Sequence, residues 1–236
     1  MSLSIKNKVA LVTGANRGIG KAIVESFLAH GADKVYLAVR NPETTTDLAR
    51  TYGERVVTLP VDMSNAESIA SLAQHARDVQ VVVNNAGVLE IADPLCDHVE
   101  AALEAEITVN VLGLIRVAKA FAPILEANGG GALIATGNTS AYRGKAKFAG
   151  FAPTKAAQRI LLESIAREAG PNGVHVAYVA IDAVIDLAWT REAFPNREDD
   201  FFCQPADIAN EVLRIAEQPR SAWAFESVIR PYAEVW

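Results

Sequence analysis

The sequence predicts a doubly wound α/β fold, in which one parallel sheet carries helices on both faces. Short runs of β-branched residues alternate with longer amphipathic segments along the chain, the order expected of parallel strands joined by helical crossovers. The short runs are apolar on both faces, as in strands that are covered on both sides. No Pro-, Gly- or Ser-rich linker and no internal repeat interrupts the 236 residues, so residues 1–236 are expected to form a single domain.

The individual elements follow from their patterns. The predicted strands are short apolar runs bounded by polar or turn residues, at positions 9–13, 34–39, 55–59, 79–83, 132–135, 174–181 and 227–230. The predicted helices repeat apolar residues at helical spacing, over positions 17–30, 43–52, 65–75, 99–126, 151–169 and 205–217. The segment 99–126 suits one long helix or two abutting ones. Pro205 begins the last helix, where its missing N–H is tolerated.

Composition excludes several classes of protein. The 22 basic and 28 acidic residues give a net charge of −6, which argues against a nucleic-acid partner. Polar residues break every apolar run before the ~18 residues that a membrane span needs, so no membrane partner is expected. Lys6 comes too early for a signal peptide, and residues 1–3 carry no structural weight. Cys96 and Cys203 are far apart, which predicts reduced thiols in a cytoplasmic protein.

A glycine-rich turn follows the first predicted strand and opens the first predicted helix. Its glycines are Gly14, Gly18 and Gly20. Glycine is needed where φ is positive or where the backbone approaches a ligand closely. The start of a helix offers free N–H groups and a positive dipole end, which suit a pyrophosphate. A tight turn alone would use such residues too, but their place between the first strand and first helix favours a dinucleotide cofactor.

The end of the second predicted strand indicates which cofactor is preferred. An acidic residue there would bind the 2′-hydroxyl of NAD, but Arg40 and Asn41 occupy this point. Arg40 can grip a 2′-phosphate through two hydrogen bonds, and Arg17 in the glycine turn can add a second positive charge. The sequence therefore predicts NADP(H) as the preferred cofactor, with NAD(H) possible.

At this point the chain resembles the short-chain dehydrogenase/reductase family. Residues 13–20 match its cofactor turn, Asp62 its adenine-contacting aspartate, residues 84–87 its NNAG signature, Asn110 its helix asparagine and Lys155 the lysine of Tyr-x-x-x-Lys. The resemblance spans nearly the whole chain and implies a single Rossmann-type NAD(P)-binding domain, an oxidoreductase of alcohols and carbonyls, and a dimer or tetramer. The cofactor-binding residues that it implies are Gly14, Asn16, Arg17, Gly18, Ile19, Gly20, Arg40, Asp62, Met63, Asn84, Ala86, Gly87, Lys155 and Ile185.

The chain departs from the family pattern at the catalytic positions. The family tyrosine falls on Phe151, and the family serine falls on Asn138. Thr139 or Ser140 would supply a hydroxyl only if the loop register shifted. The Phe-Ala-x-x-Lys sequence resembles a divergent branch of the family. The implied catalytic positions are therefore Asn110, Asn138, Tyr142, Phe151 and Lys155.

Phe151 keeps the aromatic ring but has no proton to give. It lies four residues before Lys155 on one predicted helix, so the two share a face. A positioned acid or base contributes roughly 10²–10⁴ in rate, so we expect slow carbonyl reduction. Tyr142 is one candidate for a substitute acid. Alternatively, its ring only packs over the site.

Two other sources of a proton remain. Asp182 and Asp186 follow the sixth predicted strand, although turn formation or helix capping also explains them. A water held by Asn110 and Lys155 is the last alternative. His30, His75, His98 and His175 are scattered without metal-ligand spacing, so no metal site is expected.

Two further segments suggest how the site is covered and how copies of the chain associate. The segment 187–202 holds four aromatic residues and suits either a substrate lid or ordinary loop packing. The segments 111–127 and 151–169 are apolar over more than one stripe, which predicts a homo-oligomer. The tail adds Trp223, Phe225, Val228, Ile229, Tyr232 and Trp236.

Taken as a sequence, the chain is predicted to be an NADP(H)-dependent short-chain dehydrogenase/reductase homologue. Its substrate would be a small carbonyl or alcohol, handled by an altered catalytic set. The alternative is a non-catalytic NADP(H)-binding sensor or structural protein. A sugar-nucleotide epimerase is disfavoured because the chain has no room for a substrate domain.

Overall fold

Seven parallel strands form the centre of the molecule. The computed structural model describes residues 4–234, and Trp236 of the predicted apolar tail lies outside them. The sheet order is β3-β2-β1-β4-β5-β6-β9, and each neighbouring pair is parallel. The strands are β1 (Val9–Thr13), β2 (Lys34–Val39), β3 (Val56–Pro60), β4 (Val81–Asn84), β5 (Gly131–Asn138), β6 (Val174–Ile181) and β9 (Glu226–Ile229). The predicted α/β fold class is confirmed.

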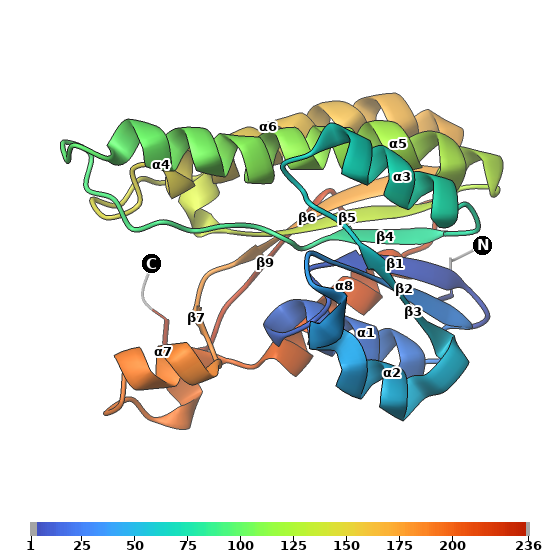
Figure 1. Cartoon of the computed structure of the whole chain (residues 1–236), viewed down its shortest axis with the longest axis horizontal. Helices are drawn as coiled ribbons and strands as arrows, with labels where there is room; N and C mark the ends of the chain where they lie inside the picture. The colour runs from blue at the N-terminus through green and yellow to red at the C-terminus, as the bar shows by residue number, and fades with distance from the viewer. Residues whose placement is uncertain (1–3, 235–236) are drawn as a thin grey trace.

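Helices cover both faces of this sheet (Figure 1). The lower face in that view carries α1 (Gly18–Ala29), α2 (Thr46–Tyr52) and α8 (Pro205–Ala216). The upper face carries α3 (Ala66–His75), α4 (Val99–Glu106), α5 (Gly113–Ala127) and α6 (Phe151–Ala169). Alternate residues of the strands point to opposite faces, so Val12 joins a core with Phe27, whereas Leu11 joins a second core with Phe121. Burial on both faces explains why the strands are apolar throughout.

The predicted helix over 99–126 is one continuous helical run with a change of winding in the middle. A π-helical segment, η3 (Ile107–Leu112), joins α4 to α5. Such segments are rare and are frequent at functional sites. Asn110 lies inside this one and is fully buried.

The same helical run corrects one expectation. Among residues 4–234, Val99–Ala127 is one helix long and apolar enough to cross a membrane, judged by length and composition. The sequence was expected to contain no such stretch. Leu114, Phe121 and Leu125 of this run are fully buried in the core, although only a third of its most apolar window is buried. One such helix is weak evidence for a membrane span, because core helices of soluble proteins meet the same criterion.

Several short elements were not predicted. The 3₁₀ turns are η1 (Pro42–Thr45), η2 (Gly53–Arg55), η4 (Thr139–Ala141) and η5 (Gly170–Asn172). An excursion after β6 contains β7 (Val184–Ile185), α7 (Ala188–Ala193), η6 (Asp199–Phe201) and β8 (Phe202–Cys203). β7 and β8 pair with each other apart from the main sheet. Strands of two residues are too short to show an alternating pattern.

Most aromatic residues of this excursion pack on one another. The Phe201 ring lies 5.6 Å from that of Phe194 and 5.1 Å from that of Phe202, centroid to centroid. The Arg191 guanidinium lies 4.0 Å from the centroid of Phe202. Trp189, in contrast, is 55% exposed. The excursion is therefore internally packed and leaves one large aromatic side chain at the surface.

The strand order determines where a ligand can bind. β1 lies between β2 and β4. From β1 the chain extends the sheet on one side with β2 and β3, and then on the other side with β4, β5, β6 and β9. In open α/β sheets, ligands bind at the carboxyl ends of the strands where the order reverses in this way. The residues that follow β1 and β4 are therefore the place to look for a site.

Candidate functional site

The glycine turn joins β1 to α1 with almost no space between its backbone segments. Gly14 and Gly18 have φ values of +66° and +52°, which residues other than glycine rarely adopt. A Cβ atom at Gly20 would overlap the Gly14 carbonyl. Arg17, the N-cap residue of α1, makes no side-chain cap. The first amides of α1 are therefore left for an anion at the crevice.

A network around Asn85 fixes the ends of three strands at this crevice. The Thr13 hydroxyl oxygen accepts hydrogen bonds from the N–H groups of Asn85 and Ala86, both at 2.9 Å. The Asn85 side chain donates to the Thr13 carbonyl at 3.1 Å and accepts from the Thr136 hydroxyl at 3.0 Å. A Cβ atom at Gly14 would lie 3.1 Å from the Ala86 Cα. The glycine turn and the 84–87 segment, predicted separately, are thus in direct contact.

The predicted adenosine-side residues lie at the ends of the next two strands. Arg40 is exposed directly after β2, and Asp62 is exposed shortly after β3. The Asp62 carboxylate accepts hydrogen bonds from the Ser64 hydroxyl and N–H, at 2.7 and 2.9 Å. These bonds lower the pKa of Asp62, and the Arg40 charge lowers it further. Met63 packs against Gly113 at the start of α5.

Four more predicted cofactor residues differ in how exposed they are. Asn16 and Ile19 are half-buried in the glycine turn. The Asn84 side chain is buried, and its Oδ1 has no hydrogen-bond partner among residues 4–234. Ile185 packs against the α1–α8 core. Leu187 lies against Gly18, 3.1 Å from the position of a Cβ there, so the excursion after β6 begins on the glycine turn.

Asn110 and Glu106 clamp the chain that leaves β4. The Asn110 side chain accepts from the N–H of Val88 and donates to its carbonyl, both at 2.9 Å. It also donates to the Thr154 hydroxyl at 3.2 Å. One turn earlier, the Glu106 carboxylate accepts from the N–H of Glu90 at 2.7 Å. Both side chains thus point from the same helical run toward the segment that follows Gly87.

Lys155 is buried beside this clamp. Its Nζ donates to Gln158 Oε1 at 2.8 Å, and Gln158 Nε2 donates to the Asn110 backbone carbonyl at 2.6 Å. The Phe151 ring centroid lies 5.3 Å from Nζ. Burial lowers the pKa of Lys155 to about 8, although the Glu106 carboxylate acts in the opposite direction. The Gln158 amide connects Lys155 to the Asn110 backbone, so within the described residues the two are joined by a side chain where a water was expected.

Glu106 was not predicted as a site residue. Burial raises its pKa, and its Oε2 has no hydrogen-bond partner among the described residues. Oε2 lies so close to Gly150 that a Cβ there would collide with it. Its spacing of four residues before Asn110 is the one sequence signal for a shared helix face. In the sequence it looks like any glutamate of an exposed helix.

The end of β5 lacks the hydroxyl that the family pattern would place there. β5 and β6 pair without interruption through Asn138 and Ile181, so the register does not shift toward Thr139 or Ser140. The Asn138 side chain accepts from the Ser140 N–H at 3.1 Å. The Thr139 hydroxyl donates a hydrogen bond to Asp182. The Thr139 hydroxyl is thus engaged with Asp182, and a hydroxyl from Ser140 stays a prediction.

Tyr178 holds the backbone of Asn138 in place from below. Its hydroxyl is bonded to both the N–H and the carbonyl of Asn138, each at 3.1 Å. A Cβ at Gly137 would overlap the Tyr178 hydroxyl, which explains the glycine in this strand. Burial raises the pKa of Tyr178 to about 12, so its phenol stays neutral and serves the fold.

The proposed substitute acids are engaged elsewhere. Tyr142 donates its hydroxyl to Glu226 on β9 and stacks at 5.4 Å on the Arg159 guanidinium. Asp182 is buried and accepts from Arg143 at 2.9 and 3.3 Å. These contacts tie both side chains to groups outside the Lys155 cluster.

Asp186 is also unsuited to donate a proton. Its carboxylate accepts from Arg191 at 2.7 and 2.8 Å and from Gln204 at 2.8 Å. These bonds lower the pKa of Asp186 to about 2, so it is anionic at neutral pH. Its position anchors α7 to β8.

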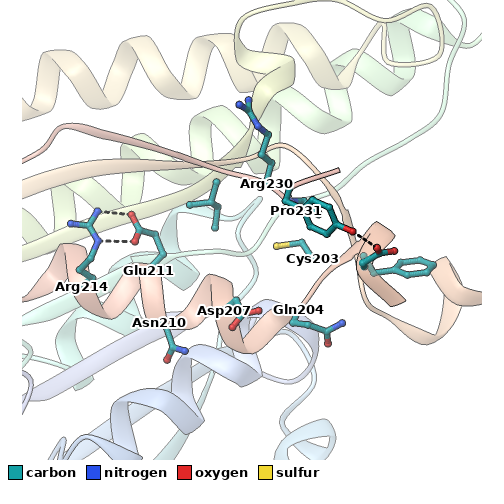
Figure 2. A pocket seen from close by; sticks show the side chains of 12 residues that line it. Cys203, Gln204, Asp207, Asn210, Glu211, Arg214, Arg230 and Pro231 are labelled. Atoms are coloured by element: carbon teal, nitrogen blue, oxygen red, sulfur yellow. Dashed lines mark hydrogen bonds and ion pairs between the residues drawn. The ribbon is translucent and has the colours of Figure 1, made fainter. Parts of the chain in front are cut away.

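A separate pocket lies between α8, β8 and the segment that follows β9 (Figure 2). It has a volume of about 450 Å³, and neither the glycine turn nor Lys155 lines it. Arg214 pairs with Glu211 there, and Tyr232 donates to Asp200. Burial raises the pKa of its Cys203 thiol to about 11. The Cys203 thiol is thus a weak nucleophile.

Within residues 4–234 no three His, Cys, Asp or Glu side chains are grouped to hold a metal ion.

Comparison with known proteins places this site in context. The family described as short chain dehydrogenase matches residues 8–195. An uncharacterised oxidoreductase of Staphylococcus aureus (strain USA300) is 30% identical over 232 residues, covering 96% of this chain and 98% of that protein. A short chain dehydrogenase from Burkholderia cenocepacia J2315, crystallised with NADP, is 31% identical with a TM-score of 0.84, covering 96% of this chain and 90% of that one. A metagenomic short-chain oxidoreductase crystallised with NADP is 29% identical with a TM-score of 0.82, covering 96% and 98%.

The buried lysine should reduce stability in a pH-dependent way. The pKa of Lys155 is about 8 in the folded chain against an ordinary 10.5. Below pH 8 both states carry the charge, and the folded state bears the full cost of burying it. Between those values only the folded state releases the proton, so the folded protein gains stability as pH rises.

Lys155→Met should therefore raise the free energy of unfolding at pH 7 by up to about 3 kcal/mol, since one pKa unit corresponds to about 1.4 kcal/mol and the pKa falls from 10.5 to about 8. The gain should shrink from pH 8 upward. Urea unfolding of both proteins across this range measures it, with Lys119→Met, an exposed change on α5, as the control. A variant less stable than the parent at pH 7 would contradict the prediction.

Proposed function

The chain belongs to the short chain dehydrogenase family, and from that premise we propose that it binds NADP(H) and transfers a hydride between the nicotinamide and a small carbonyl or alcohol. The observation that supports cofactor binding best is the hydrogen bond from the Ala86 N–H to the Thr13 hydroxyl, which joins the glycine turn to the 84–87 segment at the carboxyl ends of β1 and β4. Bound NADPH would supply the hydride. The amides at the start of α1 would bind the pyrophosphate, and Lys155 would donate to the nicotinamide ribose.

A preference for NADP(H) over NAD(H) rests on charge. Arg40 follows β2 where an NAD-binding site would have a carboxylate, and it acts electrostatically on Asp62 across the same rim. Arg17 is exposed at the start of α1 and adds a second cation. Two related structures were crystallised with NADP, which supports the same choice. NAD(H) would bind more weakly.

The catalytic set is altered, and we assign the chain to a branch without the usual tyrosine. Phe151 and Asn138 stand where a phenol and a hydroxyl would act on the substrate oxygen. Hydride transfer by proximity alone can persist in such a site. Reduction of simple carbonyls would then be slow, because no positioned side chain protonates the oxygen.

The second candidate function is a non-catalytic NADP(H)-binding sensor or structural protein. It is favoured by the contacts that engage Tyr142, Asp182 and Asp186 away from Lys155. A titration with NADPH, run beside a turnover screen on a broad carbonyl panel, separates the two functions. Binding without turnover would support the second, and turnover would support the first.

Four further assignments accompany this proposal, on domain organisation, lid, cellular location and partners. Residues 1–236 form one NAD(P)-binding domain, and residues 187–202 act as its substrate lid, with Trp189 exposed for contact with a substrate. We place the protein in the cytoplasm, where its free Cys96 and Cys203 would stay reduced. We propose neither a nucleic-acid partner nor a membrane partner.

Replacing Arg40 with Ala should weaken NADP(H) binding and leave NAD(H) binding nearly unchanged. A lost charge-assisted hydrogen bond costs about 1.5–3 kcal/mol, which is roughly tenfold or more in affinity. Fluorescence titrations with both reduced cofactors measure the effect. Arg50→Ala on α2, which removes an exposed arginine paired with Asp47, is the control. Equal weakening for both cofactors would show that Arg40 does not touch the 2′-phosphate.

Replacing Phe151 with Tyr should raise the rate on simple carbonyls by about tenfold or more, below the 10²–10⁴ of a fully positioned acid. The new phenol would lie one helical turn from Lys155, whose charge lowers its pKa. Asn138→Ser should add to the gain, although not additively, since both groups would act on one oxygen. Steady-state rates with NADPH measure this. Normal NADPH binding without a gain on any carbonyl tested would mean that the pocket is not built for this chemistry.

We also expect a homo-oligomer. Ile107 and Leu112 on the α4–α5 run and Ile160 on α6 each expose more than a third of their surface, which leaves an apolar area on the outer side of these helices. Light scattering at micromolar concentration should give at least a dimer, and Ile160→Glu should reduce its mass. Ala29→Glu, an exposed change at the end of α1 on the other face, should not. A monomeric parent would end this hypothesis.

A further inference from the structure

A buried chain of hydrogen bonds links Asn110 to Lys155 through one side chain. Gln158 accepts from Lys155 Nζ at 2.8 Å and donates to the Asn110 backbone carbonyl at 2.6 Å. Gln158 is 1% exposed and Lys155 is 7% exposed. Protein atoms alone form this series of hydrogen bonds, and burial shields it from water.

A carboxamide is well suited to this place. It carries an acceptor and a donor on one planar group, so a single side chain can satisfy an ammonium and a backbone carbonyl together. Gln158 lies three residues after Lys155 on α6, on the same helix face. Unlike a water, it is fixed covalently to the helix and cannot exchange.

A carboxamide is also a poor carrier of protons. An ammonium proton that moved onto Oε1 could continue to the Asn110 carbonyl only if Nε2 gave up a proton, which would leave the unfavourable imidic acid form. Phe151, on the other side of Nζ at 5.3 Å, has no exchangeable proton. Gln158 and Phe151 thus each block a proton path that a water and a phenol would provide at these two positions.

We infer that Gln158 is a positioning residue that fixes the Lys155 ammonium as a donor toward the cofactor and closes its proton path on the Asn110 side. The inference rests on the proposed cofactor binding for its functional meaning. Glu106 on α4 is the other charged group that acts on Lys155, and the Phe151 ring and Gly87 complete its surroundings. Lys155 would thus hold the cofactor instead of relaying protons.

The first test measures the protonation of Lys155 itself and needs no cofactor. Lysine signals of protein labelled with carbon-13 lysine are followed by NMR between about pH 6 and pH 11, and Lys155→Met identifies the Lys155 signal. Gln158→Leu removes the acceptor, so the Lys155 midpoint should fall by about one pH unit or more from its value near 8. Gln158→Glu, which puts a carboxylate there, should raise it.

The matched control is Gln80→Leu. Gln80 accepts a hydrogen bond from the Val9 N–H at 3.1 Å, at the amino-terminal ends of the central strands β1 and β4. This variant should lose stability without moving the Lys155 midpoint. If Gln158 served only packing, replacing it would lower stability and leave the Lys155 midpoint in place. Unchanged Lys155 midpoints in both Gln158 variants would therefore overturn the inference.

The second test asks whether the proton path is closed. Gln158→Ala leaves room for water between Asn110 and Lys155, so it should increase the carbonyl-reductase rate of Phe151→Tyr by about fivefold or more. In the parent, where Phe151 has no proton to pass on, it should give no gain. An equal rate in Phe151→Tyr with and without Gln158→Ala would overturn the closed path.

Cofactor titrations keep the two proposals distinguishable. A parent protein that fails to bind NADPH would contradict the proposed function, while the NMR midpoints would still decide whether Gln158 positions Lys155. If the parent binds NADPH, Gln158→Leu should bind it at least about fivefold more weakly at pH 8, because less of its Lys155 is charged. Undiminished binding by that variant would overturn the claim that Gln158 presents the lysine to the cofactor.

Discussion

A buried ammonium is the constraint on which the candidate site depends. Removing a charge from water costs several kcal/mol unless partners compensate for it. Lys155 receives compensation of three kinds: a hydrogen-bond acceptor from Gln158, the charge of Glu106 and the face of the Phe151 ring. Because burial still lowers its pKa to about 8, the compensation is incomplete. The site holds its cation at the expense of stability.

The backbone of the α4–α5 run makes this arrangement possible. Asn110 lies in the π-helical segment, where the backbone departs from the regular pattern of the α-helix. Its carbonyl accepts from Gln158, while its side chain clamps Val88 on the other side. One residue thereby couples the chain that leaves β4 to the lysine on α6. The glycine turn is coupled to the same chain through Ala86, so the cofactor turn and the lysine share one support.

Local patterns were sufficient to predict the fold class and the glycine turn between β1 and α1, because strand alternation, helix period and glycine spacing are properties of neighbouring residues. Asp62, Asn110 and Lys155 were proposed from the family resemblance instead. Gln158 escaped prediction because its meaning depends on the packing of α6 against the π-helical segment, which no local pattern encodes. Tyr142, Asp182 and Asp186 could be placed near the site, but their partners Glu226, Arg143 and Arg191 come from tertiary structure. The strands β7 and β8 are too short for any period to reveal them.

What Lys155 is for can be argued from its cost. A helix that needed only to pack would carry an apolar residue there, since replacing a buried charge by an apolar group of similar volume is often neutral or stabilising. Places where a chain breaks the rules of folding are commonly functional. Here the buried charge has specific partners, because Gln158 and Glu106 are both buried around the ammonium. Phe151, whose ring lies against the same ammonium, has no proton to donate. A site that keeps a costly cation beside a ring with no exchangeable proton is suited to hold an electron-rich group more than to exchange protons with it.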